Sequence, residues 1–108
     1  MVFQVSAALL DACVLAVLGQ SDVYGYELTQ RIKNVMKISE STLYPVLRRL
    51  QKENLVTAYD MPYNGRNRRY YSITQAGMDK LSDYRREWEE YKNSVDRIMG
   101  GMIGNEQG

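Results

Sequence analysis

The C-terminal third of the chain carries a heptad pattern that a small single-chain domain cannot readily cover. Apolar and glycine residues alternate there in steps of four and three, and the positions between them are mostly charged. The pattern comprises Gly77, Leu81, Tyr84, Trp88, Tyr91, Val95, Ile98 and Met102. Such a spacing predicts a long helix that packs along one seam, on its own domain or on another chain. Nothing else among the 108 residues is long enough to cover it, which favours a partner helix.

The N-terminal segment leads to the same expectation. Apart from Gln4, Ser6 and Asp11, the stretch from about Gln4 to Leu18 is apolar, and Gly19 follows it as a helix terminator. A helix that is apolar on every side must be covered all round, which a partner subunit could do. We therefore predict a homodimer formed through the last helix with help from the first. The predicted interface residues are Leu9, Leu10, Leu81, Trp88, Tyr91, Val95, Ile98 and Met102.

The N-terminal run from Val2 to Leu18 is not expected to be a signal peptide or a membrane anchor. It has no basic residues before it, it contains Asp11, and it barely reaches the length needed to span a bilayer. Cys13 is the only cysteine, so an intrachain disulfide is excluded and nothing argues for secretion. We expect a cytoplasmic protein without a membrane partner.

The middle of the chain reads as two helices followed by a hairpin. Residues 24–35 fit one helix, and a second begins at Ser39 or Ser41 and ends near position 53 or 54. A Ser41 cap would place Pro45 near the first turn, whereas a Ser39 cap would imply a bend. Residues 55–60 and 68–73 read as strands around a tip with Asn64-Gly65, and Thr74 then caps the last helix. The fold class is mainly α with a small β-hairpin (α+β), a winged helix-turn-helix followed by a long dimerisation helix.

Positive charge is concentrated in this middle part. Residues 31–71 contain nine Lys and Arg and three Asp and Glu, whereas the chain as a whole has a net charge of +1. A local concentration of this kind indicates a binding site for a polyanion, and the alternative is an ordinary solvated face. The third helix can enter a major groove, and the basic hairpin tip suits phosphates or the adjacent minor groove. The predicted DNA-binding residues are Tyr24, Ser41, Thr42, Tyr44, Pro45, Arg48, Arg49, Lys52, Arg66, Asn67, Arg68 and Arg69.

Three sequence stretches closely resemble the PadR family of bacterial transcriptional regulators. They are residues 24–28 (YGYEL), residues 41–50 (STLYPVLRRL), and residues 65–74 with Gly77. The similarity covers about residues 9–98, and the single C-terminal helix resembles the short PadR subfamily. It implies a homodimeric repressor that binds double-stranded DNA at an inverted repeat, often with ATGT/ACAT-type half-sites, and that small molecules release in some members.

Trp88 follows Gly77 at the spacing at which LmrR-like, multidrug-responsive members place a tryptophan that stacks on planar ligands. The resemblance implies a planar aromatic effector at the dimer interface, with Trp88, Asp11, Tyr84, Tyr91 and Val95 around it. The alternative is that Trp88 simply packs in the seam. The glycine-rich end of the last helix departs from these members.

The expected organisation is a DNA-binding domain over residues 1–74, a dimerisation helix over 75–104 and a frayed tail over 105–108. We expect no enzyme, cofactor or metal site, because there is no histidine and no phosphate-binding loop or metal-ligand cluster. The alternative function is a winged helix that binds another protein, although a protein-binding wing need not be basic.

Overall fold

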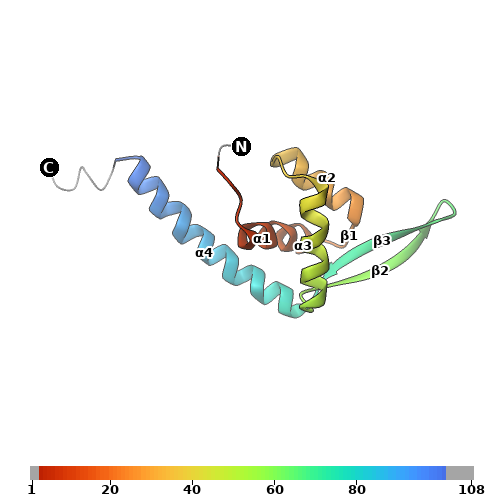
Figure 1. Ribbon diagram of the computed structural model, residues 1–108. Coiled ribbons are helices and arrows are strands. Elements are labelled where there is room, and N and C mark those ends of the chain that lie inside the picture. The colour runs from red at the N-terminus through yellow and green to blue at the C-terminus, as the bar shows by residue number, and fades with distance from the viewer. Residues whose placement is uncertain (1–2, 102–108) are drawn as a thin grey trace.

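The computed structural model describes residues 3–101, which form four helices and a three-stranded sheet (Figure 1). In chain order the elements are α1 (Ala7–Leu18), β1 (Val23–Tyr24), α2 (Gly25–Val35), α3 (Glu40–Lys52), β2 (Val56–Tyr63), β3 (Arg66–Ile73) and α4 (Gln75–Met99). This arrangement confirms the predicted α+β winged helix with a long last helix. Met102, which the sequence placed on the seam of that helix, lies outside the described residues, as do residues 103–108.

Local capping decides where the helices begin and end. α1 begins three residues later than expected, because the Ser6 hydroxyl accepts a hydrogen bond from the Leu9 amide and so caps the helix. α3 has Ser39, not Ser41, as its N-cap, which places Pro45 in the second turn. The missing amide of Pro45 falls on the exposed side of the helix, where water can satisfy the Ser41 carbonyl. α3 ends in a Schellman motif, in which Asn54 adopts a φ of 62° and the Leu55 amide donates to the Leu50 carbonyl.

The sheet has the order β1-β3-β2 and is antiparallel throughout. The hairpin strands are longer than predicted, and only Asn64 and Gly65 remain in the turn, with φ values of 50° and 76°. Both positive values confirm the predicted tip, since a two-residue turn of this kind matches the twist of the strands. β1 was not predicted, because two residues are too short to show an alternating pattern. It pairs Val23 with Tyr71 and Tyr24 with Tyr70.

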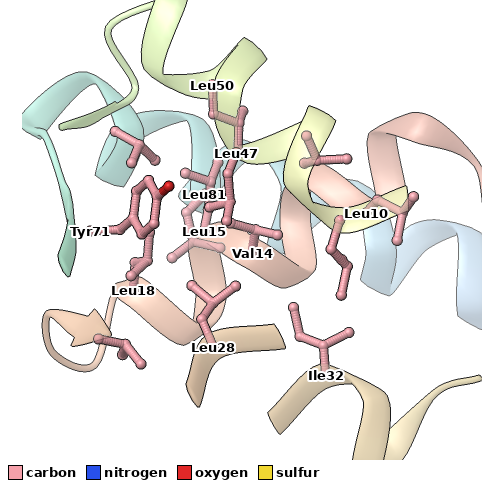
Figure 2. Close-up of a cluster of buried hydrophobic side chains, with 14 residues drawn as sticks. Leu10, Val14, Leu15, Leu18, Leu28, Ile32, Leu47, Leu50, Tyr71 and Leu81 are labelled. Carbon is pink, nitrogen blue, oxygen red and sulfur yellow. The ribbon is translucent and has the colours of Figure 1, made fainter. Parts of the chain in front are cut away.

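The core lies where α1, α2, α3 and the inner face of the sheet meet (Figure 2). α1 supplies Leu10, Val14, Leu15 and Leu18, and the buried leucines of α3, Leu28 of α2 and Tyr71 of β3 pack against them. From α4, Leu81 reaches this cluster. Close packing fixes the start of α4, since a Cβ at Gly77 would lie 2.2 Å from the Leu55 carbonyl oxygen.

Beyond this core, α4 and the β2–β3 hairpin leave the lower end of α3 in opposite directions (Figure 1). The described residues extend over 68 × 28 × 20 Å, and the two projections account for the long dimension. Both projections therefore expose side chains that the body of the domain does not cover.

Among residues 3–101, no helix combines the length and the apolar character that crossing a membrane requires.

Candidate nucleic-acid interface

One side of α3 presents a continuous exposed row. Ser41, Pro45, Arg48 and Lys52 recur at helical spacing and are all exposed, and Thr42 lies beside them. The opposite side of the helix is buried through Leu43, Val46, Leu47 and Leu50. Tyr44 lies at the boundary and is half-buried. The arrangement leaves hydroxyl and basic groups outward, which is the chemistry that a helix needs to read base edges in a major groove.

Several of the basic residues in the charged window are occupied by acidic partners. Arg31 pairs with Glu27 at 2.8 Å, and Lys33 pairs with Glu40 at 3.3 Å. On the hairpin, Arg69 Nε lies 3.4 Å from Asp60 Oδ1. In the described part of the chain, Lys37, Arg48, Lys52 and Arg66 make no ion pair. The charge available to a polyanion is thus concentrated on α3, on the turn before it and at the hairpin tip.

Arg49 is held by the protein itself. Its guanidinium donates to Asp11 of α1, and its other terminal nitrogen lies 3.5 Å from Glu53. Asp11 is only 7% exposed, so this pair neutralises a carboxylate that would otherwise be buried alone. The hydrogen bond to Asp11 raises the pKa of Arg49. The structure therefore pairs Arg49, which was predicted to bind DNA, with Asp11, which was predicted to bind a ligand. Their contact holds α3 against α1.

The outer face of the sheet carries an aromatic cluster that the sequence reading did not identify. Tyr24, Tyr59 and Tyr70 share this face because Tyr24 on β1 and Tyr59 on β2 are both cross-strand neighbours of Tyr70. The rings of Tyr59 and Tyr70 stack at 5.7 Å, and those of Tyr24 and Tyr70 lie 5.9 Å apart. The Tyr59 hydroxyl donates a hydrogen bond to Asp22 over 2.7 Å, and this bond raises the pKa of Tyr59. Arg68 lies over both the Tyr24 and Tyr63 rings.

Around Trp88, α1 and α4 expose an apolar surface. Two shallow hollows of about 450 Å³ and 330 Å³ adjoin there, and both are lined by Leu9, Ala12, Tyr84 and Trp88. Trp88 is 42% exposed, and its ring lies 6.1 Å from that of Tyr91. Further along α4, Ile98 is 67% exposed and Val95 is half-buried. This surface is the uncovered part of the heptad seam.

Two residues that the sequence assigned to the dimer interface lie elsewhere. Leu10 and Leu81 are buried in the core of the single chain. The reason is that the first turns of α4 lie against α1, so the N-terminal part of the seam is already covered within one chain. Cys13, beside the second hollow, has a pKa raised by burial, which keeps the thiol protonated.

The sequence analysis missed the Asp11–Arg49 pair and the aromatic cluster, and the sequence indicates these two features to different degrees. An aspartate in an otherwise apolar helix requires a buried partner, and that signal pointed to a cation without saying which one. On β2, Tyr59, Met61 and Tyr63 occupy every second position, and this spacing could have placed them on one face of the strand. Their connection to β1 had no signal in the sequence.

Comparison with known proteins agrees with this geometry. Residues 14–83 match the model of the transcriptional regulator PadR-like family. The structure is similar to that of smu.1704 from Streptococcus mutans, with a TM-score of 0.86 and 40% identity, covering 94% of this chain and 95% of that one. A PadR-like transcriptional regulator from Bacillus cereus has a TM-score of 0.77 and 32% identity, covering 84% of this chain and 91% of that one. The transcriptional regulator Rv3488 of Mycobacterium tuberculosis is 36% identical, covering 76% of this chain and 75% of the relative.

Proposed function

We propose that this chain, which belongs to the PadR-like family of DNA-binding transcriptional regulators and not to a family of enzymes, is a homodimeric repressor that binds an inverted-repeat operator. The observation that carries the proposal is the exposed row of Ser41, Pro45, Arg48 and Lys52 on α3. This row lies on a helix whose other side is fixed in the core, so its side chains are presented in a rigid frame.

The side chains predicted to bind DNA divide into two roles. Arg48 and Tyr44 lie in the middle of α3 and are assigned to base edges. Lys52, Arg66 and Arg69 lie at the end of α3 and on the hairpin and are assigned to phosphates. Ser41, Thr42, Pro45 and Asn67 add polar and van der Waals contacts beside them. Arg49 contributes by holding α3 against α1, because its guanidinium is paired with Asp11.

Dimerisation is assigned to the apolar surface of α1 and α4. Leu9, Trp88, Tyr91, Val95 and Ile98 are the residues of the predicted interface that the single chain leaves partly or largely exposed. Burial of such a strip between two copies removes apolar area from water and places the two α3 helices about a two-fold axis. An inverted repeat is the DNA site that matches this symmetry. The cytoplasm, where bacterial DNA lies, is the assigned location.

A small planar aromatic molecule is the proposed effector, and the two hollows beside Trp88 support it. Trp88, Tyr84 and Tyr91 offer ring faces, with Val95 farther along the seam. Glu87, which lines the larger hollow, supplies the negative charge that a cationic ligand needs, since Asp11 is engaged by Arg49. The competing assignment is simple packing of Trp88 against its partner copy. Titration of a planar cationic dye followed by Trp88 fluorescence distinguishes them, because Trp88 is the only tryptophan.

Selection of bound duplexes from random DNA, followed by sequencing, tests the main proposal. We expect enrichment of a motif with two-fold symmetry, and binding that weakens steeply as salt increases. A protein-binding winged helix would give neither an enriched motif nor a steep salt dependence. An enriched motif without symmetry would contradict the dimeric mode of binding while leaving DNA recognition intact.

A further inference from the structure

The hairpin formed by β2 and β3 projects away from the body of the domain (Figure 1), and residues 59–67 around its tip are all exposed. β1 pairs only as far along β3 as Tyr70, so among the described residues β2 is the only strand paired with residues 66–69. A two-stranded hairpin is marginal in water by itself. Some interaction must fix its direction if the tip is to reach DNA at a defined place.

Arg68 occupies the position at which such an interaction is possible. It is the cross-strand neighbour of Met61, so Tyr63 on β2 is its diagonal neighbour on the same face. Tyr24 pairs with Tyr70, two residues along β3, and is therefore diagonal to Arg68 on the other side. The Arg68 guanidinium carbon lies 3.7 Å from the centre of the Tyr63 ring and 4.6 Å from that of Tyr24.

These contacts continue as a chain toward the body of the domain. Tyr24 packs on Tyr70, Tyr70 stacks on Tyr59 with an angle of 12° between the rings, and Tyr59 donates a hydrogen bond to Asp22. Tyr24 is also the N-cap residue of α2. The stack thus connects the hairpin tip to the start of the helix-turn-helix through a single guanidinium.

From this arrangement we propose that Arg68 is a positioning residue that sets the direction of the wing through Tyr24 and Tyr63, and does not act as a phosphate contact. The proposal rests on the proposed DNA-binding function and refines it. A guanidinium suits this role because it is planar and can stack on two rings at once, whereas the compact ammonium of lysine cannot. Arg68 is less exposed than its neighbours Arg66 and Arg69, as expected for a side chain held between rings.

The decisive variant is Arg68→Lys, which keeps the charge and removes the planar stack. In the free protein, we expect the backbone amides of residues 63–68 to exchange with solvent about threefold to thirtyfold faster than in the unmodified chain. Operator affinity should fall within the same range, and the salt dependence should remain unchanged because the number of neutralised phosphates is the same. Arg66→Lys, at the same tip without a ring contact, is the matched control and should affect exchange much less.

A double-mutant cycle assigns the effect to the rings. In a Tyr63→Leu background, Arg68→Lys should change tip exchange by less than half as much, in logarithmic terms, as in the unmodified chain. Equal effects in both backgrounds, or unchanged exchange in Arg68→Lys, would overturn the proposal. Unchanged operator binding by Arg68→Lys would instead identify a phosphate contact, since lysine also binds phosphate. The exchange measurement needs no DNA, so its outcome is independent of whether the proposed function holds.

Discussion

Two surfaces of this molecule have opposite chemistry, one on α3 and the hairpin and the other on α1 and α4. On α3 and at the hairpin tip, the exposed side chains include hydroxyls and cations, and Arg48, Lys52 and Arg66 have no acidic partner among the described residues. Along α1 and α4, the exposed side chains include Trp88, Tyr91 and Ile98. A solvated cation is stable without a partner, but a row of aromatic and aliphatic residues in water is not. The charged surface is therefore stable without DNA, and we propose that a second copy of the chain covers the apolar surface.

The same negative charge placed at two positions of the α4 seam distinguishes the buried part of the seam from its exposed part. Leu81→Asp buries a carboxylate in the core, where shortening a leucine alone costs about 2–5 kcal/mol, so this variant should not fold. Ile98→Asp places the charge on the exposed part of α4 and should give a folded monomer. Circular dichroism and sedimentation report the two outcomes. A folded Leu81→Asp dimer, or an unfolded Ile98→Asp chain, would contradict the assignment of the two positions.

Gly77 lies at the start of α4, where this helix packs closely against Leu55, and its replacement tests this contact. Gly77→Ala places a methyl group against the Leu55 carbonyl and should destabilise the fold by about 1–3 kcal/mol. Gly19→Ala is the matched control, because its new methyl group would meet a Leu81 methyl 3.0 Å away, which can shift. Urea unfolding of both variants gives the difference. Equal stability would show that α4 can move away from Leu55 at little cost.

Within the charged surface, Arg48 and Lys52 separate base recognition from phosphate contact. Arg48→Ala should weaken operator binding by about 1–3 kcal/mol and relax sequence preference, while affecting random DNA less. Lys52→Ala should weaken operator and random DNA similarly and reduce the salt slope by about one. Fluorescence anisotropy with both duplexes measures these effects. If Arg48→Ala lowered the two affinities equally, the assigned roles would be reversed.

Asp11 on α1 pairs with Arg49 on α3, and we expect its replacement to have the smallest effect of these variants. Asp11→Asn removes the charge that faces Arg49 and should destabilise the fold by about 1–2 kcal/mol, a value reduced by the partial exposure of Arg49. Glu53→Gln, which alters the exposed partner of the same guanidinium, should cost less than about 0.5 kcal/mol. Thermal unfolding at neutral pH compares them. A larger loss in Glu53→Gln would show that Asp11 does not carry the interaction.

The order of the four helices and the hairpin was predictable because each of these elements carries its own local signal. Asn64-Gly65 identifies the tip, Thr74 identifies the start of α4, and the leucine stripe of α3 identifies its buried side. The exposed row on α3 followed from the same helical spacing. These features depend on neighbours within about four residues, so a single sequence contains them.

What could not be predicted depends on contacts between distant parts of the chain. Asp11 and Arg49 are 38 residues apart, and several other cations were equally available as the partner. The Tyr24 and Arg68 contact depends on β1, whose two residues form a strand only because β3 offers an edge. Leu81 entered the core because the first turns of α4 pack on α1, a choice that the uniform heptad pattern did not reveal.

We propose that the apolar surface pairs two copies of the chain so that their charged surfaces act together on DNA. Analytical ultracentrifugation of the unmodified chain, alone and with its selected duplex, tests this directly. We predict a dimer at micromolar concentration without DNA and two chains on each duplex with it. A stable, folded monomer under those conditions, or a complex with one chain on each duplex, would contradict the account.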